Sequence, residues 1–96
     1  MLDIYTSTRF KRDLKQIQRQ GRDVNALWSV VDTIAREEPL DKKYQDHALT
    51  GDFRGHRECH IEPDWLLIYR IDSRGLVLTL VRTGSHSSLL GKQRRR

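Results

Sequence analysis

Cysteine is nearly absent from this sequence: Cys59 is the only one among 96 residues. One thiol cannot form an internal disulfide, and it cannot supply the several cysteines of a typical structural zinc site. Long apolar runs are absent as well, so no segment predicts a membrane span, and residues 1–12 lack the apolar centre of a secretory signal. These absences predict a protein of the cytoplasm that has no membrane partner.

Apolar residues are also scarce. They make up 36% of the chain, whereas 32% of its residues are charged. This content supports one modest core, so we expect a single domain over residues 1–91 and a mobile basic tail over residues 92–96. The 18 lysines and arginines outnumber the 13 acidic residues and give a net charge of +5. A small basic domain favours a polyanionic partner, either a nucleic acid or an acidic protein.

The first half of the chain predicts a short strand at residues 2–5, followed by two helices. Two sets of apolar residues recur at helical spacing: Phe10, Leu14 and Ile17, followed by Val24, Leu27, Trp28, Val31 and Ile34. A hydroxyl among residues 6–8 can cap the first helix and Asp23 the second, while Gly21 can end the first. We therefore expect an antiparallel helical hairpin, with Trp28 in the core.

The second half changes to the pattern of a sheet. Residues 41–51 are polar and aperiodic and predict a loop. Strands are expected at residues 54–61, 65–71 and 76–82, with turns at residues 63–64 and 72–75 and a short turn or helix at residues 85–90. The last two strands are almost continuously apolar, which places them centrally with one face under the helices. The order predicts an α+β fold, in which an N-terminal strand and a two-helix hairpin pack on a small, mainly antiparallel sheet.

Several reactive side chains stand in loops or at strand ends, where a rigid sheet often presents an active site. The candidate site residues are His47, His60, Asp64, Trp65, Arg82 and His86, whereas His56 is interpreted as a surface residue. His47 lies in the predicted loop, His60 near a strand end and His86 directly after the last strand. One histidine in such a position is more often structural, but three beside an aspartate and an arginine indicate chemistry.

A metal site is one alternative, because His47, His60, Asp64 and His86 are ligand types that suit zinc or iron. No local spacing such as HExxH or CxxC preorganises them, however, so the sequence predicts no metal and no cofactor. Nucleophilic catalysis by Cys59 is a weaker alternative. Cys59 and His60 alternate along one predicted strand and point to opposite faces, so they cannot pair, and a buried inert thiol is expected.

RNA cleavage through the ribose 2′-hydroxyl fits these residue types better. The reaction needs a base for the 2′ proton, an acid for the leaving 5′ oxygen, and positive charge beside the phosphorane-like transition state. Histidine suits the proton steps because it titrates near neutral pH. Arginine offers a fixed fork of donors to phosphate oxygens, and an aromatic ring such as that of Trp65 can hold an unstacked base. No metal is required.

Three segments of the second half resemble the signature of one family: Tyr44–Leu49 (YQDHAL), His60–Tyr69 (HIEPDWLLIY) and Arg82–Leu90 (RTGSHSSLL). In this order they are similar to the YafQ-type toxins of the RelE/ParE superfamily. The resemblance implies a small sheet backed by two helices and an antitoxin protein that wraps the toxin. It also implies cleavage of mRNA in the A site of the ribosome, beside rRNA.

The resemblance also implies roles for individual residues. The family's catalytic positions correspond to His47, His60, Asp64, Arg82 and His86, and its substrate-binding positions to Trp65 and Leu90. Our hypothesis takes His86 as the general acid and either Asp64 or His47 as the base, while Arg82 and protonated His60 stabilise the phosphate. Leu90 stands where the best-known relatives carry an aromatic residue, a departure that affects base stacking and not the proton chemistry.

Two other functions fit the same scaffold or composition. A ParE-like protein would poison DNA gyrase, although that activity needs no relay of histidines and an aspartate. A non-catalytic basic module would repress transcription or sequester an acidic partner. Growth inhibition that depends on His86 would argue against the second alternative.

Overall fold

The computed structural model describes residues 1–91, so the basic tail predicted at residues 92–96 lies outside the described residues. Within residues 1–91 the elements follow the order β1 (Asp3–Thr6), α1 (Thr8–Arg19), α2 (Val24–Ala35), β2 (His47–Ala48), β3 (Arg57–Glu62), β4 (Trp65–Ile71) and β5 (Val77–Gly84). Three short helical turns complete this part of the chain: η1 (Lys42–Tyr44), η2 (Gly51–Phe53) and η3 (Ser87–Gly91). Neither α1 nor α2 has the length and apolarity that a membrane-spanning helix needs.

The sheet has the order β1-β5-β4-β3-β2 within the described residues. Among the strands of residues 1–91, only β1 and β5 pair in parallel and the other neighbours are antiparallel, which confirms the predicted α+β fold with a mainly antiparallel sheet. β4 occupies the centre, as its apolar sequence predicted. The prediction of a plain loop at residues 41–51 was wrong, because β2 pairs there with β3 through Ala48 and Arg57. Two residues are too few to show an alternating pattern.

Local hydrogen bonds explain where the helices begin and end. The Ser7 hydroxyl accepts a bond from the Phe10 amide at 2.9 Å, and an Asp23 carboxylate oxygen accepts one from the Asn25 amide at 3.0 Å. Each bond satisfies an amide that has no partner in the first helical turn. Gly21 follows α1 with φ of +76°, a conformation that glycine adopts without strain. The caps expected from the sequence are therefore confirmed.

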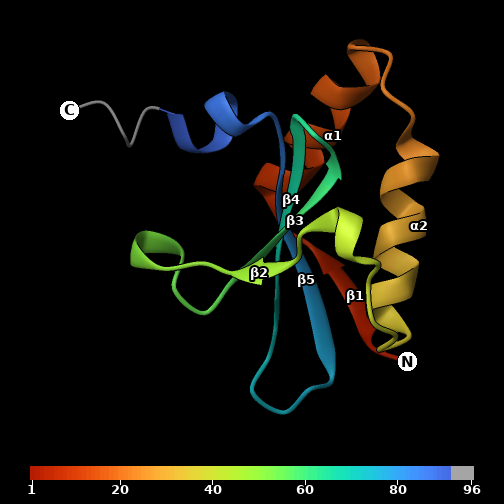
Figure 1. The fold of residues 1–96 in the computed structure, drawn as a ribbon, viewed down its shortest axis with the longest axis vertical. Helices are drawn as coiled ribbons and strands as arrows, with labels where there is room; N and C mark the ends of the chain where they lie inside the picture. The colour runs from red at the N-terminus through yellow and green to blue at the C-terminus, as the bar shows by residue number, and fades with distance from the viewer. Residues whose placement is uncertain (92–96) are drawn as a thin grey trace.

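The main core lies between the helices and one face of the sheet. Phe10 and Ile17 of α1 and Leu27 of α2 pack there against Leu67 and Leu80. Figure 1 shows α2 on one side of the sheet and the C-terminal turn on the other. On that second face a smaller cluster forms where Leu89 of η3 covers Leu66 and Ile68 of β4.

Trp28 does not belong to the core, which corrects the prediction made for it. The side of α2 that meets the sheet carries Leu27 and Val31, and Trp28 lies on its flank with 38% of its surface exposed. The Trp28 ring meets Phe10 edge to face, with ring centres 6.2 Å apart. Helical spacing correctly predicts that Trp28 lies near the apolar face of α2. Spacing alone does not separate a residue at the centre of that face, which is buried, from its neighbour at the edge, which is partly exposed.

A bulge in β5 decides which face receives Arg82. Ile68 pairs with Arg82, whereas the next residue, Tyr69, pairs with Leu80, so Val81 is the extra residue. Leu80 faces the helices, and strict alternation would place Arg82 on the same face. The bulge instead aligns Arg82 with Ile68, on the face that α1 and α2 leave uncovered.

Candidate active site

One row of cross-strand neighbours crosses the face opposite the helices. His47 of β2 pairs with Glu58 of β3, Glu58 pairs with Ile68 of β4, and Ile68 pairs with Arg82 of β5. Directly paired residues present their side chains on the same face of a sheet. The register therefore assembles an imidazole, a carboxylate and a guanidinium in one line.

His60 lies on the same face, one row away, opposite Leu66. Its Nδ1 donates to the Pro63 carbonyl oxygen at 3.3 Å, because a carbonyl can only accept. Its Nε2 lies 3.9 Å from a Glu58 carboxylate oxygen, and the two side chains are 20% and 4% exposed. A protonated His60 would thus meet a nearly buried negative charge, in a partly enclosed part of the face.

Glu58 is one of two site residues that the sequence interpretation missed. A glutamate is seldom buried unless it is paired, so a carboxylate with 4% exposure beside two histidines is an unusual feature. A usable signal was present in the sequence. Glu58 and His60 stand two positions apart on the predicted strand, and residues at that spacing share a face.

His47 is exposed on the edge strand β2. Its Nδ1 donates to the Gln45 carbonyl oxygen at 2.7 Å, which leaves Nε2 as the nitrogen that can exchange a proton. The neighbouring Asp46 fixes this edge of the sheet, because it accepts a 2.6 Å bond from the Tyr69 hydroxyl and a 3.2 Å ion pair from Arg57. The two residues that precede His47 are therefore both held by hydrogen bonds, and Gln45 also holds the imidazole ring.

Arg82 is not free in the structure, although the sequence suggested an arginine that is available to phosphate. Its Nε and Nη2 donate to the two carboxylate oxygens of Asp13 at 2.7 and 3.1 Å. The same carboxylate accepts a bond from the Thr83 amide at 3.1 Å, so α1 closes the open edge of β5. Within residues 1–91, Nη1 of Arg82 has no such partner and keeps its donors. No feature of the sequence had marked Asp13.

Trp65 is a core residue, and the prediction that its ring stacks on a base is corrected. The ring is 0% exposed and its Nε1 donates to the Thr83 hydroxyl at 2.8 Å. Arg22 of the inter-helix turn covers it, with the guanidinium carbon 5.6 Å from the ring centre. Trp65 faces the helices because it opens β4 in phase with Leu67. A base cannot reach a ring in that position.

Asp64 and His86 lie at one end of the sheet. β3 and β5 are both antiparallel to β4, so they run in the same direction and end at the same edge. Asp64 lies in the turn after β3, and His86 lies two residues after the end of β5, both as exposed residues. Leu90 falls within η3, just beyond His86. Loops at this end thus flank the face that carries His60 and Arg82.

The structure also bears on the two weaker alternatives. Within residues 1–91, no three histidine, cysteine, aspartate or glutamate side chains lie close enough together to hold a metal ion. Cys59 is 0% exposed, as predicted. Burial, followed by the charges of Asp46 and Glu58, raises the pKa of the Cys59 thiol to about 12, so the reactive thiolate is disfavoured.

Comparisons with known proteins are consistent with one another. A family model described as the bacterial toxin of a type II toxin–antitoxin system, YafQ, matches residues 2–91. The mRNA interferase toxin YafQ of Escherichia coli strain K12 is 37% identical over 90 residues, which cover 93% of this chain and 96% of that protein. YafQ in the E. coli DinJ–YafQ toxin–antitoxin complex superposes with a TM-score of 0.85 at 36% identity, over 94% of this chain and 98% of that one. A metal-bound toxin from Helicobacter pylori gives 0.87 at 48% identity, over 93% and 99%.

Proposed function

The chain belongs to the YafQ family of toxins from bacterial type II toxin–antitoxin systems, and from this premise we propose that it cuts mRNA on the ribosome without a metal ion. In the proposed reaction the ribose 2′-hydroxyl attacks the adjacent phosphate and the 5′ oxygen leaves. The observation that carries this proposal is the row of His47, Glu58 and Arg82, with His60 beside it, on the face that the helices leave uncovered.

The proton steps are assigned to residues at the rim of this face. His86 is the proposed general acid, since it is exposed and lies two residues after the end of β5. Either His47 or Asp64 is the proposed base. The bond from His47 Nδ1 to Gln45 supports His47, because it fixes the ring and turns Nε2 into the proton acceptor. Asp64 is supported by its exposure at the end of β3, the edge at which β5 also ends.

Positive charge for the transition state is assigned to Arg82 and protonated His60. Asp13 holds the Arg82 guanidinium through Nε and Nη2, which leaves Nη1 as the group that would donate to a phosphate oxygen. For His60, a Glu58 carboxylate oxygen lies 3.9 Å from Nε2, close enough to attract the charge of a protonated ring. Leu90, in the η3 turn after His86, is the proposed substrate contact.

The proposed partners follow from the same premise. The E. coli relative forms a complex with the antitoxin DinJ, and we assign an antitoxin of that kind to this chain. The net charge of +5 suits both an acidic antitoxin and an RNA surface. Ribosome-bound mRNA as the substrate would place the protein in the cytoplasm.

The test is primer extension on a translated message, with and without ribosomes and in excess EDTA. We expect the wild type to produce cuts that require ribosomes and persist in EDTA, and His86→Ala to abolish them while it still binds antitoxin. His56→Ala is the matched control, because His56 contacts Phe53 edge to face and takes no proposed part in proton transfer. Cuts that EDTA removes would refute the metal-free reaction. An inert wild type would favour gyrase inhibition or a binding module.

A further inference from the structure

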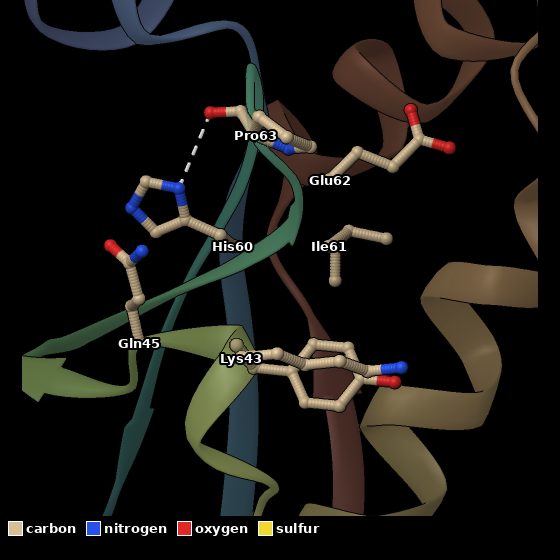
Figure 2. A pocket seen from close by; sticks show the side chains of 7 residues that line it. Lys43, Gln45, His60, Ile61, Glu62 and Pro63 are labelled. Atoms are coloured by element: carbon tan, nitrogen blue, oxygen red, sulfur yellow. Dashed lines mark hydrogen bonds between the residues drawn. The ribbon is translucent and has the colours of Figure 1, made fainter.

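A pocket of about 440 Å³ opens beside His60, between the turn η1 and the end of β3. Its walls are Lys43, Tyr44, Gln45, His60, Ile61, Glu62 and Pro63. Figure 2 shows His60 and Gln45 on one side of this space and Ile61 and Glu62 on the other. A volume of this size is within the range of small-ligand sites. The proposed reaction uses His60 and leaves the rest of the pocket without a role.

The pocket exists because β2 is short. β2 pairs only with Arg57 and Glu58, so the outer edge of β3 has no strand beside it from His60 onward within the described residues. The turn η1 lies across this gap, and Tyr44 packs against the main core. The structure thus leaves an opening at the sheet edge, next to a residue of the proposed reaction.

Gln45 connects the pocket to the candidate base. Its φ is +50°, which is uncommon for a residue other than glycine. The Gln45 amide donates to the Lys42 carbonyl at 3.0 Å, and its own carbonyl accepts the 2.7 Å bond from His47. The backbone of Gln45 is therefore fixed on both sides. Its side-chain amide, which is exposed, offers both donors and acceptors to a ligand.

The lining favours a flat neutral ligand over a phosphate group. Ile61 and Pro63 supply apolar walls. Charge is nearly balanced, because Lys43 stands over the Tyr44 ring at 5.2 Å and the Glu62 carboxylate pairs with Arg22 at 3.1 Å. The charges of Lys43 and Glu62 thus already have partners, so the pocket does not present the cluster of free positive donors that a phosphate would need. A nucleobase, with apolar faces and polar edges, matches both kinds of wall.

We propose that this pocket binds a nucleobase next to the scissile phosphate and that the Gln45 side chain reads its edge. This inference rests on the proposed ribonuclease function, and His60 links the two because it lines the pocket and faces the proposed reaction centre. Gln45 is then a specificity residue: it sets which RNA sequences are cut rather than how protons move.

Cleavage mapping on a translated message that contains every codon tests the proposal. We expect Gln45→Glu, which keeps the size but loses the amide donors, to change the ratio of cuts at preferred and single-base variant codons by roughly tenfold, the contribution of one good amide–base contact. Gln45→Asn should change it too, while it tolerates the positive φ. Gln18→Glu, on the exposed side of α1, is the charge-matched control and should leave the ratio unchanged. A uniform slowing at all codons, or an unchanged pattern, would overturn the proposal.

Direct binding separates this proposal from the ribonuclease function. His86→Ala protein is titrated with AMP, CMP, GMP and UMP while its NMR spectrum is recorded. We expect the Gln45 side-chain amide and the Ile61 backbone amide to shift, with unequal affinities among the four bases. Equal responses, or none at these groups, would overturn the pocket assignment. Selective binding by His86→Ala, together with a wild type that does not cut RNA in primer extension, would instead refute the ribonuclease function and retain the pocket.

Discussion

The sheet has a face that the helices cover and a face that they leave open. The strands β3, β4 and β5 contribute residues to both faces. On the covered face Trp65, Leu67 and Leu80 pack against the helices and are 0% exposed. The open face carries Glu58, His60 and Arg82 together with a small apolar cluster around Leu89. Because neighbouring residues of one strand point to opposite faces, the chain separates folding from chemistry by alternation.

Adjacent residues make the contrast concrete. Cys59 and His60 are neighbours on β3, yet Cys59 is 0% exposed whereas the His60 side chain is 20% exposed. Trp65 faces the helices, and the next residue, Leu66, belongs to the cluster under η3. If the two faces have different tasks, substitutions on the covered face should reduce stability, and those on the open face should reduce cleavage.

The largest effect is expected for Trp65→Ala on the covered face. Truncating a buried tryptophan costs about 3–5 kcal/mol, and Thr83 would also lose the bond from the indole. Trp28→Ala is the matched control; its 38% exposure predicts a loss nearer ~1 kcal/mol. Urea denaturation of both variants measures the difference. Equal losses would mean that the burial of Trp65 does not stabilise the covered face.

The second prediction concerns His60→Gln on the open face. We expect cleavage to slow about 100-fold, as when one group that stabilises transition-state charge is removed, and stability to change by less than about 1 kcal/mol. The rate at which cuts appear with saturating ribosomes measures cleavage, and urea denaturation measures the free energy of unfolding. His56→Gln should leave both near the wild-type values. A variant that cuts normally, or one that unfolds, would break the division between the faces.

Local interactions explain why much of this fold could be predicted from the sequence. Ser7, Gly21 and Asp23 act within a few residues of themselves, so their caps are visible in the chain. The apolar run of β4 likewise marks a central strand. Cross-strand register is different in kind, because the bulge at Val81 arises only when β4 and β5 pair. The placement of Arg82 on the open face could not be read from β5 alone.

The candidate site was predicted only in part for the same reason. The reactive types at positions 47, 60 and 86 were recognisable, but the partners that orient them come from distant segments. Asp13 pairs with Arg82 although 69 positions of the chain separate them, and no sequence pattern near either residue predicts that pair. Glu58 could have been found from its spacing to His60. Trp65 was misassigned because an aromatic beside a turn looks the same in sequence whether it faces a core or a ligand.

The last and smallest effect is a pH dependence that arises on the covered face. Burial raises the pKa of Cys59 from its ordinary value of 9.0 to about 12 in the folded protein. The unfolded chain therefore releases this proton first, so the contribution is complete below pH 9 and is lost progressively as the pH rises toward 12. Between pH 8 and pH 10 the free energy of unfolding should fall by about 1 kcal/mol from this thiol.

Cys59→Ala isolates that contribution, because the variant keeps every other titrating group. Its absolute stability will differ, but its loss between pH 8 and pH 10, followed by urea denaturation, should be about 1 kcal/mol smaller than that of the wild type. Tyr69, whose pKa is raised mainly by burial and by its bond to Asp46, stays protonated in both folded proteins up to pH 10, so it contributes equally to the two losses. Equal losses of unfolding free energy in the two proteins would mean that water reaches the thiol. The covered face would then be more hydrated at β3 than the 0% exposure of Cys59 indicates.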